Sequence, residues 1–164
     1  MQLNPKAKMV LERYKTLKAQ RVTWEDHWQE IADYFLPRKA NITEKHTKGD
    51  KRHDRIFDGT ATHSLELLSS SLNGMLTNTI SPWFVLKFRN LESIDNDAAN
   101  EWLESCAKIM QQVFSRSNFQ QEIFELYHEL LAFGTSAMFI TDDVDDDLRF
   151  KTLHISELFI TKMK

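Results

Sequence analysis

Apolar residues recur along most of the chain at the three- and four-residue spacing of amphipathic helices. Asn4-Pro5 can begin the first helix, because Asn is a good cap and Pro suits the first helical position. The pattern restarts at Thr23, a possible second cap, and Pro37 is expected to end it. The spacing therefore predicts two helices within residues 1–37.

A third helix is predicted to start at Asp58, which can cap it. Four leucines at helical spacing are expected to form its buried face: Leu65, Leu68, Leu72 and Leu76. Its other faces carry Ser, Asn and Gly, whose small side chains let another backbone approach closely. Tight packing is expected, either inside one domain or against a second subunit.

Two more helices are predicted further along the chain. Asp95 and Asp97 favour the positive end of a fourth helix. Its apolar stripe consists of Trp102, Cys106, Ile109 and Val113. Ser117 or Asn118 can cap a fifth helix, and Gly134 can adopt the left-handed conformation that ends it. The stripe of the fifth helix consists of Phe119, Ile123, Leu126, Leu130 and Phe133.

Strands are predicted in two regions. Trp83 to Phe88 alternates large residues after the third helix. Ala137 to Ile140 and Leu148 to Leu153 form a predicted hairpin, with an acidic tip over Asp142 to Asp147. The expected fold class is α+β, mainly helical, with about five helices and short antiparallel strands.

The length of 164 residues fits one domain. We expect four parts within it: N-terminal helices over 1–37, a basic mobile loop over 38–56, a helical core with one strand over 57–135, and a β region over 136–164. The last part is expected to be truncated, because Phe159 and Ile160 still need apolar partners.

The net charge of −3 conceals an uneven distribution. Residues 1–56 hold 13 Lys/Arg and 8 Asp/Glu, whereas residues 57–164 hold 8 and 16. Only the first third is therefore expected to face a polyanion or an acidic neighbour. The candidate DNA-facing residues, chosen from charge, are Arg38, Lys39, Lys45, Lys48, Lys51, Arg52 and Arg55. They would contact phosphates without reading bases; an ordinary solvated loop is the alternative.

The pattern of reactive residues predicts no enzyme, no metal site and no cofactor. The acidic tip alternates acids as a calcium loop does, but Leu148 and His154 stand where that loop has Gly and Glu. Cys106 is the single cysteine, which excludes an intrachain disulfide, and we expect it to be a buried structural thiol. No segment is apolar enough to span a bilayer, so no membrane partner is expected.

Four phrases carry a resemblance to a known family. They are Trp28-x-x-Ile31-x-x-Tyr34-x-Leu36-Pro37, Asp58-Gly59-Thr60-Ala61-Thr62 continuing to Ser81-Pro82-Trp83-Phe84, Phe114-x-x-Ser117-Asn118-Phe119, and Phe133-Gly134-Thr135-Ser136-Ala137. In this order and spacing they resemble the N-terminal, wing part of the head-to-tail connector, or portal protein, of podovirus-like phages.

The resemblance implies a structural component of the virion, made in the cytoplasm of a bacterial host. Portal subunits assemble into a ring at one capsid vertex, where they contact capsid, terminase and tail proteins and let double-stranded DNA pass. The family implies no catalytic residues. Its members are several times longer, so a fragment is expected. The alternatives are a standalone protein that binds portal or terminase, and a non-specific DNA-binding module.

Overall fold

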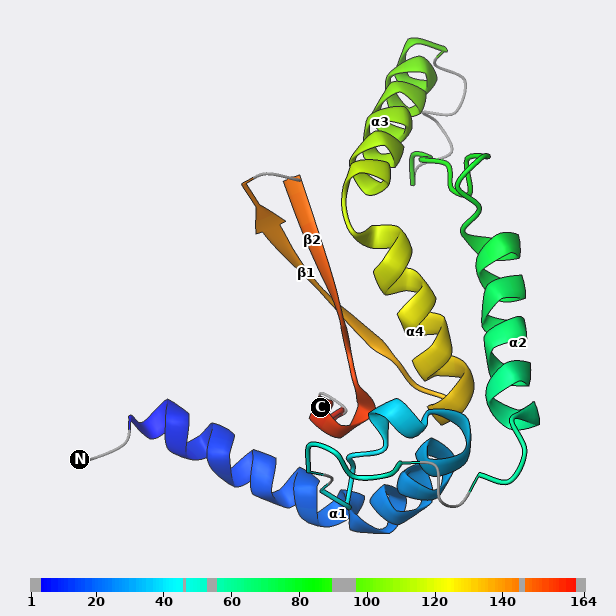
Figure 1. Cartoon of the computed structure of the whole chain (residues 1–164). Helices are drawn as coiled ribbons and strands as arrows, with labels where there is room; N and C mark the ends of the chain where they lie inside the picture. The colour runs from blue at the N-terminus through cyan, green and yellow to red at the C-terminus, as the bar shows by residue number, and fades with distance from the viewer. Residues whose placement is uncertain (1–3, 46, 53–55, 90–96, 145–146, 162–164) are drawn as a thin grey trace.

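The computed structural model describes residues 4–45, 47–52, 56–89, 97–144 and 147–161. The helices are α1 (Pro5–Phe35), α2 (Thr60–Leu76), α3 (Asp97–Arg116) and α4 (Phe119–Phe133), with short 3-10 turns η1 (Pro37–Lys39) and η3 (Ile155–Glu157). The strands are β1 (Ala137–Asp143) and β2 (Asp147–Leu153). Figure 1 shows α1 across the base, α2 and α4 upright beside each other, α3 above α4, and the hairpin rising on the other side of α4. The mainly helical α+β prediction is confirmed.

The two N-terminal helices that we predicted are one continuous helix, α1, so the described residues form four α-helices and not five. Asn4 caps it as predicted, because its Oδ1 accepts a hydrogen bond from the Lys6 N–H (3.1 Å), and the helix ends before Pro37. Thr23 lies inside the helix. The residues between the two apolar patterns include no Gly or Pro and are mostly good helix formers, so nothing interrupts the helix there.

Helix α2 packs on α4 through a narrower face than we predicted. Leu65 and Ser69 are buried, whereas Leu68 and Leu76 are about half exposed, at 52% and 53%. Ser69 can be buried because its hydroxyl donates to the Leu65 carbonyl (2.8 Å) and its small side chain admits α4. Of the small residues of α2, Ser69 therefore packs within the chain, whereas Ser70, Ser71 and Gly74 are exposed. Part of the leucine face points outward as well.

The starts of α2 and α4 differ in detail from the predicted caps. Asp58 accepts the Thr60 N–H (3.0 Å), and α2 begins at Thr60 with Gly59 in the cap position. Asn118 occupies the cap position of α4, but its amide binds the backbone of Phe150 in both directions, at 2.8 and 2.9 Å. These two bonds join the start of α4 to β2. Gly134 ends α4 with φ of 74°, as predicted.

The predicted hairpin is confirmed, with β1 antiparallel to β2 and Ala137 opposite Leu153. The strand predicted over Trp83 to Phe88 is wrong, because that segment is irregular. A strand requires a partner for its backbone groups. Here the aromatic side chains pack instead, with Trp83 stacked on Phe119 at 5.8 Å between ring centroids.

An aromatic cluster holds the upper part of the fold together. Its members come from four segments and contact one another in stacked and edge-to-face pairs: Trp83, Phe84, Phe114, Phe119 and Phe150. A second core at the base contains Ala32, Ala40, Phe133 and Ile155. Helix α4 contributes to both, so it is the central element of the fold.

The stripe predicted for α3 remains on the surface. No residue of α3 is buried among those described, Trp102 is 62% exposed, and Cys106 is half-buried and not buried as predicted. Helix α3 extends beyond the end of α4 (Figure 1), and within the described residues Trp102 and Ile109 of its stripe stay about 60% exposed, whereas Cys106 and Val113 are half-buried.

The change Phe119→Ala is expected to lower the free energy of unfolding by about 4 kcal/mol, because it removes a buried ring that contacts three others. Urea denaturation measures this loss. Phe57→Ala is the matched control, since Phe57 is almost fully exposed and its removal should change little. Equal losses for the two variants would contradict the role of the aromatic cluster.

Candidate functional site

The buried side-chain amide of Gln29, in α1, anchors the start of the basic loop. Its Oε1 accepts the backbone N–H groups of Ile42 and Thr43, both at 2.9 Å, and its Nε2 donates to the Ala40 carbonyl at 3.0 Å. The same Nε2 donates to Asp33 at 2.8 Å. One side chain therefore fixes the first turn of the loop against α1.

The predicted DNA-facing residues fall into three groups. Arg38, Lys45, Lys48 and Lys51 are exposed. Arg52 is half-buried and donates to the Arg38 carbonyl (2.6 Å), so the structure brings these two residues together. Arg55 lies outside the described residues.

Lys39 differs from the other candidates because it binds two glutamates of α4. Its ammonium group donates to Glu125 and, at 3.1 Å, to Glu129. The opposite side of Glu129 meets Nδ1 of His154 at 2.9 Å, just after β2. The side chain of Glu129 is only 1% exposed. This ion cluster ties η1, α4 and the end of the hairpin together.

Burial and pairing act in opposite directions on the ion cluster. Burial alone would lower the pKa of Lys39, but its hydrogen bond to Glu125 and the charges of both glutamates outweigh burial and raise that pKa. Burial alone would raise the pKa of Glu129, but His154 and then Lys39 lower it. The two groups therefore stay ionised. With two carboxylates beside it, Lys39 offers less positive potential to a phosphate than the exposed lysines do.

Sequence reasoning missed Gln29 and Glu129. A signal for Glu129 was present, since it stands three residues after Leu126 and four before Phe133, on the apolar stripe of its helix. A carboxylate at such a position must be paired if it is buried. Its partners, Lys39 and His154, are distant in sequence and gave no such signal.

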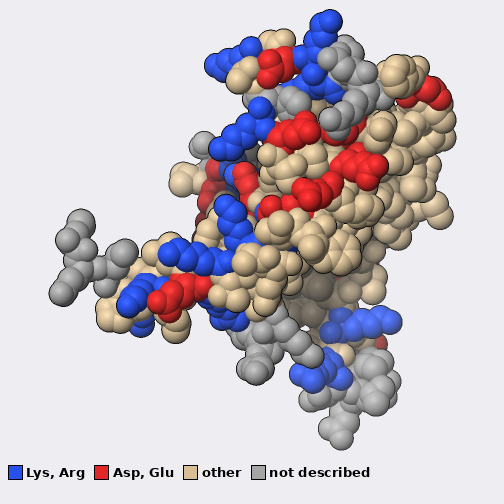
Figure 2. Space-filling view, turned by 90° about the horizontal axis from the view of Figure 1, so that it is seen from below, with Lys and Arg blue, Asp and Glu red and all other residues tan. Residues whose placement is uncertain are grey.

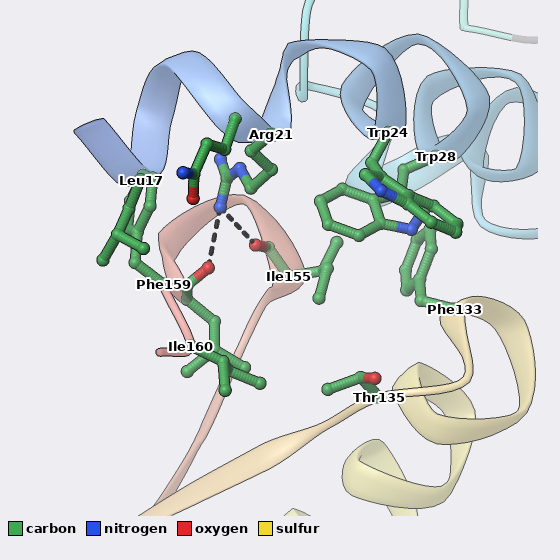
Figure 3. Close-up of a pocket in the computed structure, with 11 residues that line it drawn as sticks. Leu17, Arg21, Trp24, Trp28, Phe133, Thr135, Ile155, Phe159 and Ile160 are labelled. Carbon is green, nitrogen blue, oxygen red and sulfur yellow. Dashed lines mark hydrogen bonds between the residues drawn. The ribbon is translucent and has the colours of Figure 1, made fainter. Parts of the chain in front are cut away.

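A hollow of about 340 Å³ lies between α1 and the segment that follows β2. Figure 3 shows aromatic side chains, including Trp24, Trp28 and Phe133, along one side, and Arg21 reaching across to backbone carbonyls. Arg21 donates to the carbonyls of Ile155, Ser156 and Leu158 at 2.7–3.1 Å, and it pairs with Glu25.

The guanidinium of Arg21 is thus used for structure, and Phe159 covers it at 4.0 Å from the ring centroid. The hollow brings together no nucleophile and base. Across the part of the chain that the structure describes, no three His, Cys, Asp or Glu side chains gather as a metal site would require. None of the described helices is both long and apolar enough to cross a membrane.

Comparison with known proteins identifies the family of this chain. Residues 7–163 match the family model described as bacteriophage head to tail connecting protein. The chain belongs to this family. It is 34% identical over 139 residues to the "Probable portal protein" of Bordetella phage BPP-1, covering 84% of this chain and 25% of that relative. It is 30% identical over 152 residues to the "Portal protein" of Salmonella phage epsilon15, covering 92% and 27%. The chain thus spans about a quarter of these relatives.

The change Glu129→Gln is expected to lower the free energy of unfolding by about 3 kcal/mol, because it leaves Lys39 without its buried counter-charge and His154 without the carboxylate that it contacts. Glu125→Gln is the control: that carboxylate is 47% exposed, so the loss should stay below about 1 kcal/mol. Chemical denaturation at neutral pH distinguishes the two.

The pH dependence of stability gives a second test of Glu129, by comparing the wild type with Glu129→Gln. A lowered folded-state pKa means that Glu129 stabilises the fold above its unfolded pKa of about 4.5, and that this contribution is lost as the pH falls through the folded value. The wild type should therefore lose more stability on acidification than Glu129→Gln. Parallel pH profiles would contradict the assignment.

Proposed function

We propose that this chain is the N-terminal wing part of a phage portal subunit, and that it acts as a structural building block and not as an enzyme. The family match over residues 7–163 carries this proposal. In the proposed role the subunits form a ring at the capsid vertex within the virion. Capsid, terminase and tail proteins are its partners during DNA packaging and ejection.

The apolar surface of the described residues supports this role. Outward-facing leucines of α2 and the stripe of α3 leave several large side chains more than half exposed: Leu67, Leu68, Met75, Leu76, Trp102 and Ile109. Exposed apolar surface of this extent on two helices is typical of interaction surfaces. Other parts of a portal subunit, or neighbouring subunits, would cover it.

The test is to replace the matching region of the epsilon15 portal protein with this chain. We expect the chimaera to form rings that electron microscopy detects, as the unmodified portal protein does in a parallel preparation. A chimaera that folds but stays monomeric, under conditions in which the control assembles, would overturn the proposal.

We also propose that the exposed cations of the basic loop contact double-stranded DNA without sequence specificity. Arg38, Lys45, Lys48 and Lys51 point into solvent, and exposed lysines and arginines bind phosphates through counterion release. A single loop of this charge binds weakly. A ring presents many copies at once, which multiplies a weak contact.

Changing Lys45, Lys48 and Lys51 together to Glu should weaken binding to random duplex DNA and make the salt dependence shallower. The slope of log affinity against log salt should fall by up to roughly 3 in magnitude, one for each lost phosphate contact. The control variant carries the same charge change on exposed lysines elsewhere: Lys87→Glu, Lys108→Glu and Lys151→Glu. Equal slopes for the two variants would contradict the proposal that the basic loop contacts DNA.

A further inference from the structure

Charge divides α1 into two halves of opposite sign. Residues 5–21 hold six Lys/Arg and a single acid, Glu12, whereas residues 22–35 hold four Asp/Glu and no Lys or Arg. The helix has 31 residues without interruption, a length of roughly 45 Å at 1.5 Å per residue. Arg21 and Glu25 pair where the two halves meet, and the remaining positive and negative charges lie toward opposite ends of one helix.

The basic half projects from the body of the molecule. Figure 1 shows the N-terminal end of α1 extending past the hairpin and the other helices. Arg13 and Tyr14 tie this half to the C-terminal segment, through Thr161 (3.3 Å) and Phe159 (4.8 Å between centroids). Closer to its tip, Met9 and Val10 are more than 60% exposed. The tip is thus accessible to another molecule.

The two charges share the outward face of the helix. Lys8, Lys15, Asp26 and Glu30 are exposed, and their spacings place them along one side at 100° per residue. The opposite side carries Leu17, Arg21 and Trp28, which line the hollow. Seen from the side of α1, Figure 2 shows basic side chains on the projecting end and a band of acidic side chains nearer the centre.

We infer that α1 joins neighbouring copies of this chain: the projecting basic half of one copy binds the acidic second half of α1 in the next. The exposed apolar residues beside each half, Met9 and Val10 at the tip and Val22 and Trp24 near the acids, are brought together in the same contact. The occupant is a second copy because the two halves of one helix are complementary in charge.

The proposed ring requires this contact to be heterologous, with the basic half of each copy bound to the acidic half of the next copy. Such contacts repeat around a ring, whereas an isologous contact stops at two copies. This step rests on the proposed ring. Exposed ion pairs are weak and screened by salt, so a single contact should be reversible and salt-sensitive.

The experiment measures the mass of the full chain in solution over a range of protein concentration, at low and at high salt. One variant reverses the basic end, Lys8→Glu with Lys15→Glu, and another reverses the acidic end, Asp26→Lys with Glu30→Lys. Matched controls carry the same charge changes on exposed positions of other elements: Lys87→Glu with Lys108→Glu, and Glu66→Lys with Glu104→Lys. Circular dichroism confirms that each variant folds.

We expect the wild type to form species larger than two copies at low salt, which dissociate at high salt. Each end variant should require at least about tenfold more protein to associate, because like charges then face each other. A mixture of the two end variants should associate as the wild type does, since each reversed end then meets its complement. The control variants should behave as the wild type.

Three results would overturn the inference: association that stops at two copies, association that neither end variant weakens, or a wild type that stays monomeric throughout. The chimaera experiment is independent of this one. If a chimaera that carries either reversed end still forms rings, the proposed portal role stands, but α1 is not the contact between neighbouring copies.

Discussion

The buried carboxylate of Glu129 imposes the constraint on which much of the base of this fold depends. An ionised group that is 1% exposed must have its lone pairs filled by donors. Lys39 arrives from the turn after α1, and His154 from the residue after β2. The pairing therefore specifies how α1, α4 and the hairpin meet, which apolar packing alone would specify less sharply. It also pairs Lys39, a half-buried residue of the basic loop, with two glutamates of α4.

Gln29 complements this constraint from the other side of the turn. Its amide satisfies backbone groups of Ala40, Ile42 and Thr43, so the chain leaves α1 along one defined path. The exposed lysines begin only beyond that point. The exposed cations of the basic loop therefore follow a segment whose path is fixed by side-chain interactions. The residues that fix it are either uncharged, as Gln29 is, or paired with opposite charges, as Lys39 is.

Periodicity predicted the elements that are determined locally. The stripe of α4, the left-handed Gly134, the Asn4 cap and the hairpin all follow from neighbours in sequence, and the structure contains each of them. The remainder depended on contacts between distant segments. Trp83 to Phe88 alternates as a strand would, but its rings pack with Phe114 and Phe119 and it has no ladder. The leucines of α2 predicted too wide a buried face: Leu65 is buried as expected, but Leu68 and Leu76 are about half exposed and the small Ser69 is buried instead.

Helix α1 is one uninterrupted helix that spans two proposed functional parts of the surface. No glycine or proline interrupts it between Pro5 and Phe35, so its two ends cannot tilt independently. The projecting tip lies at one end of this helix, and Gln29, which anchors the basic loop, lies toward the other end. One continuous helix therefore links the tip to the start of the basic loop, and whatever holds the tip also constrains where the charged surface lies.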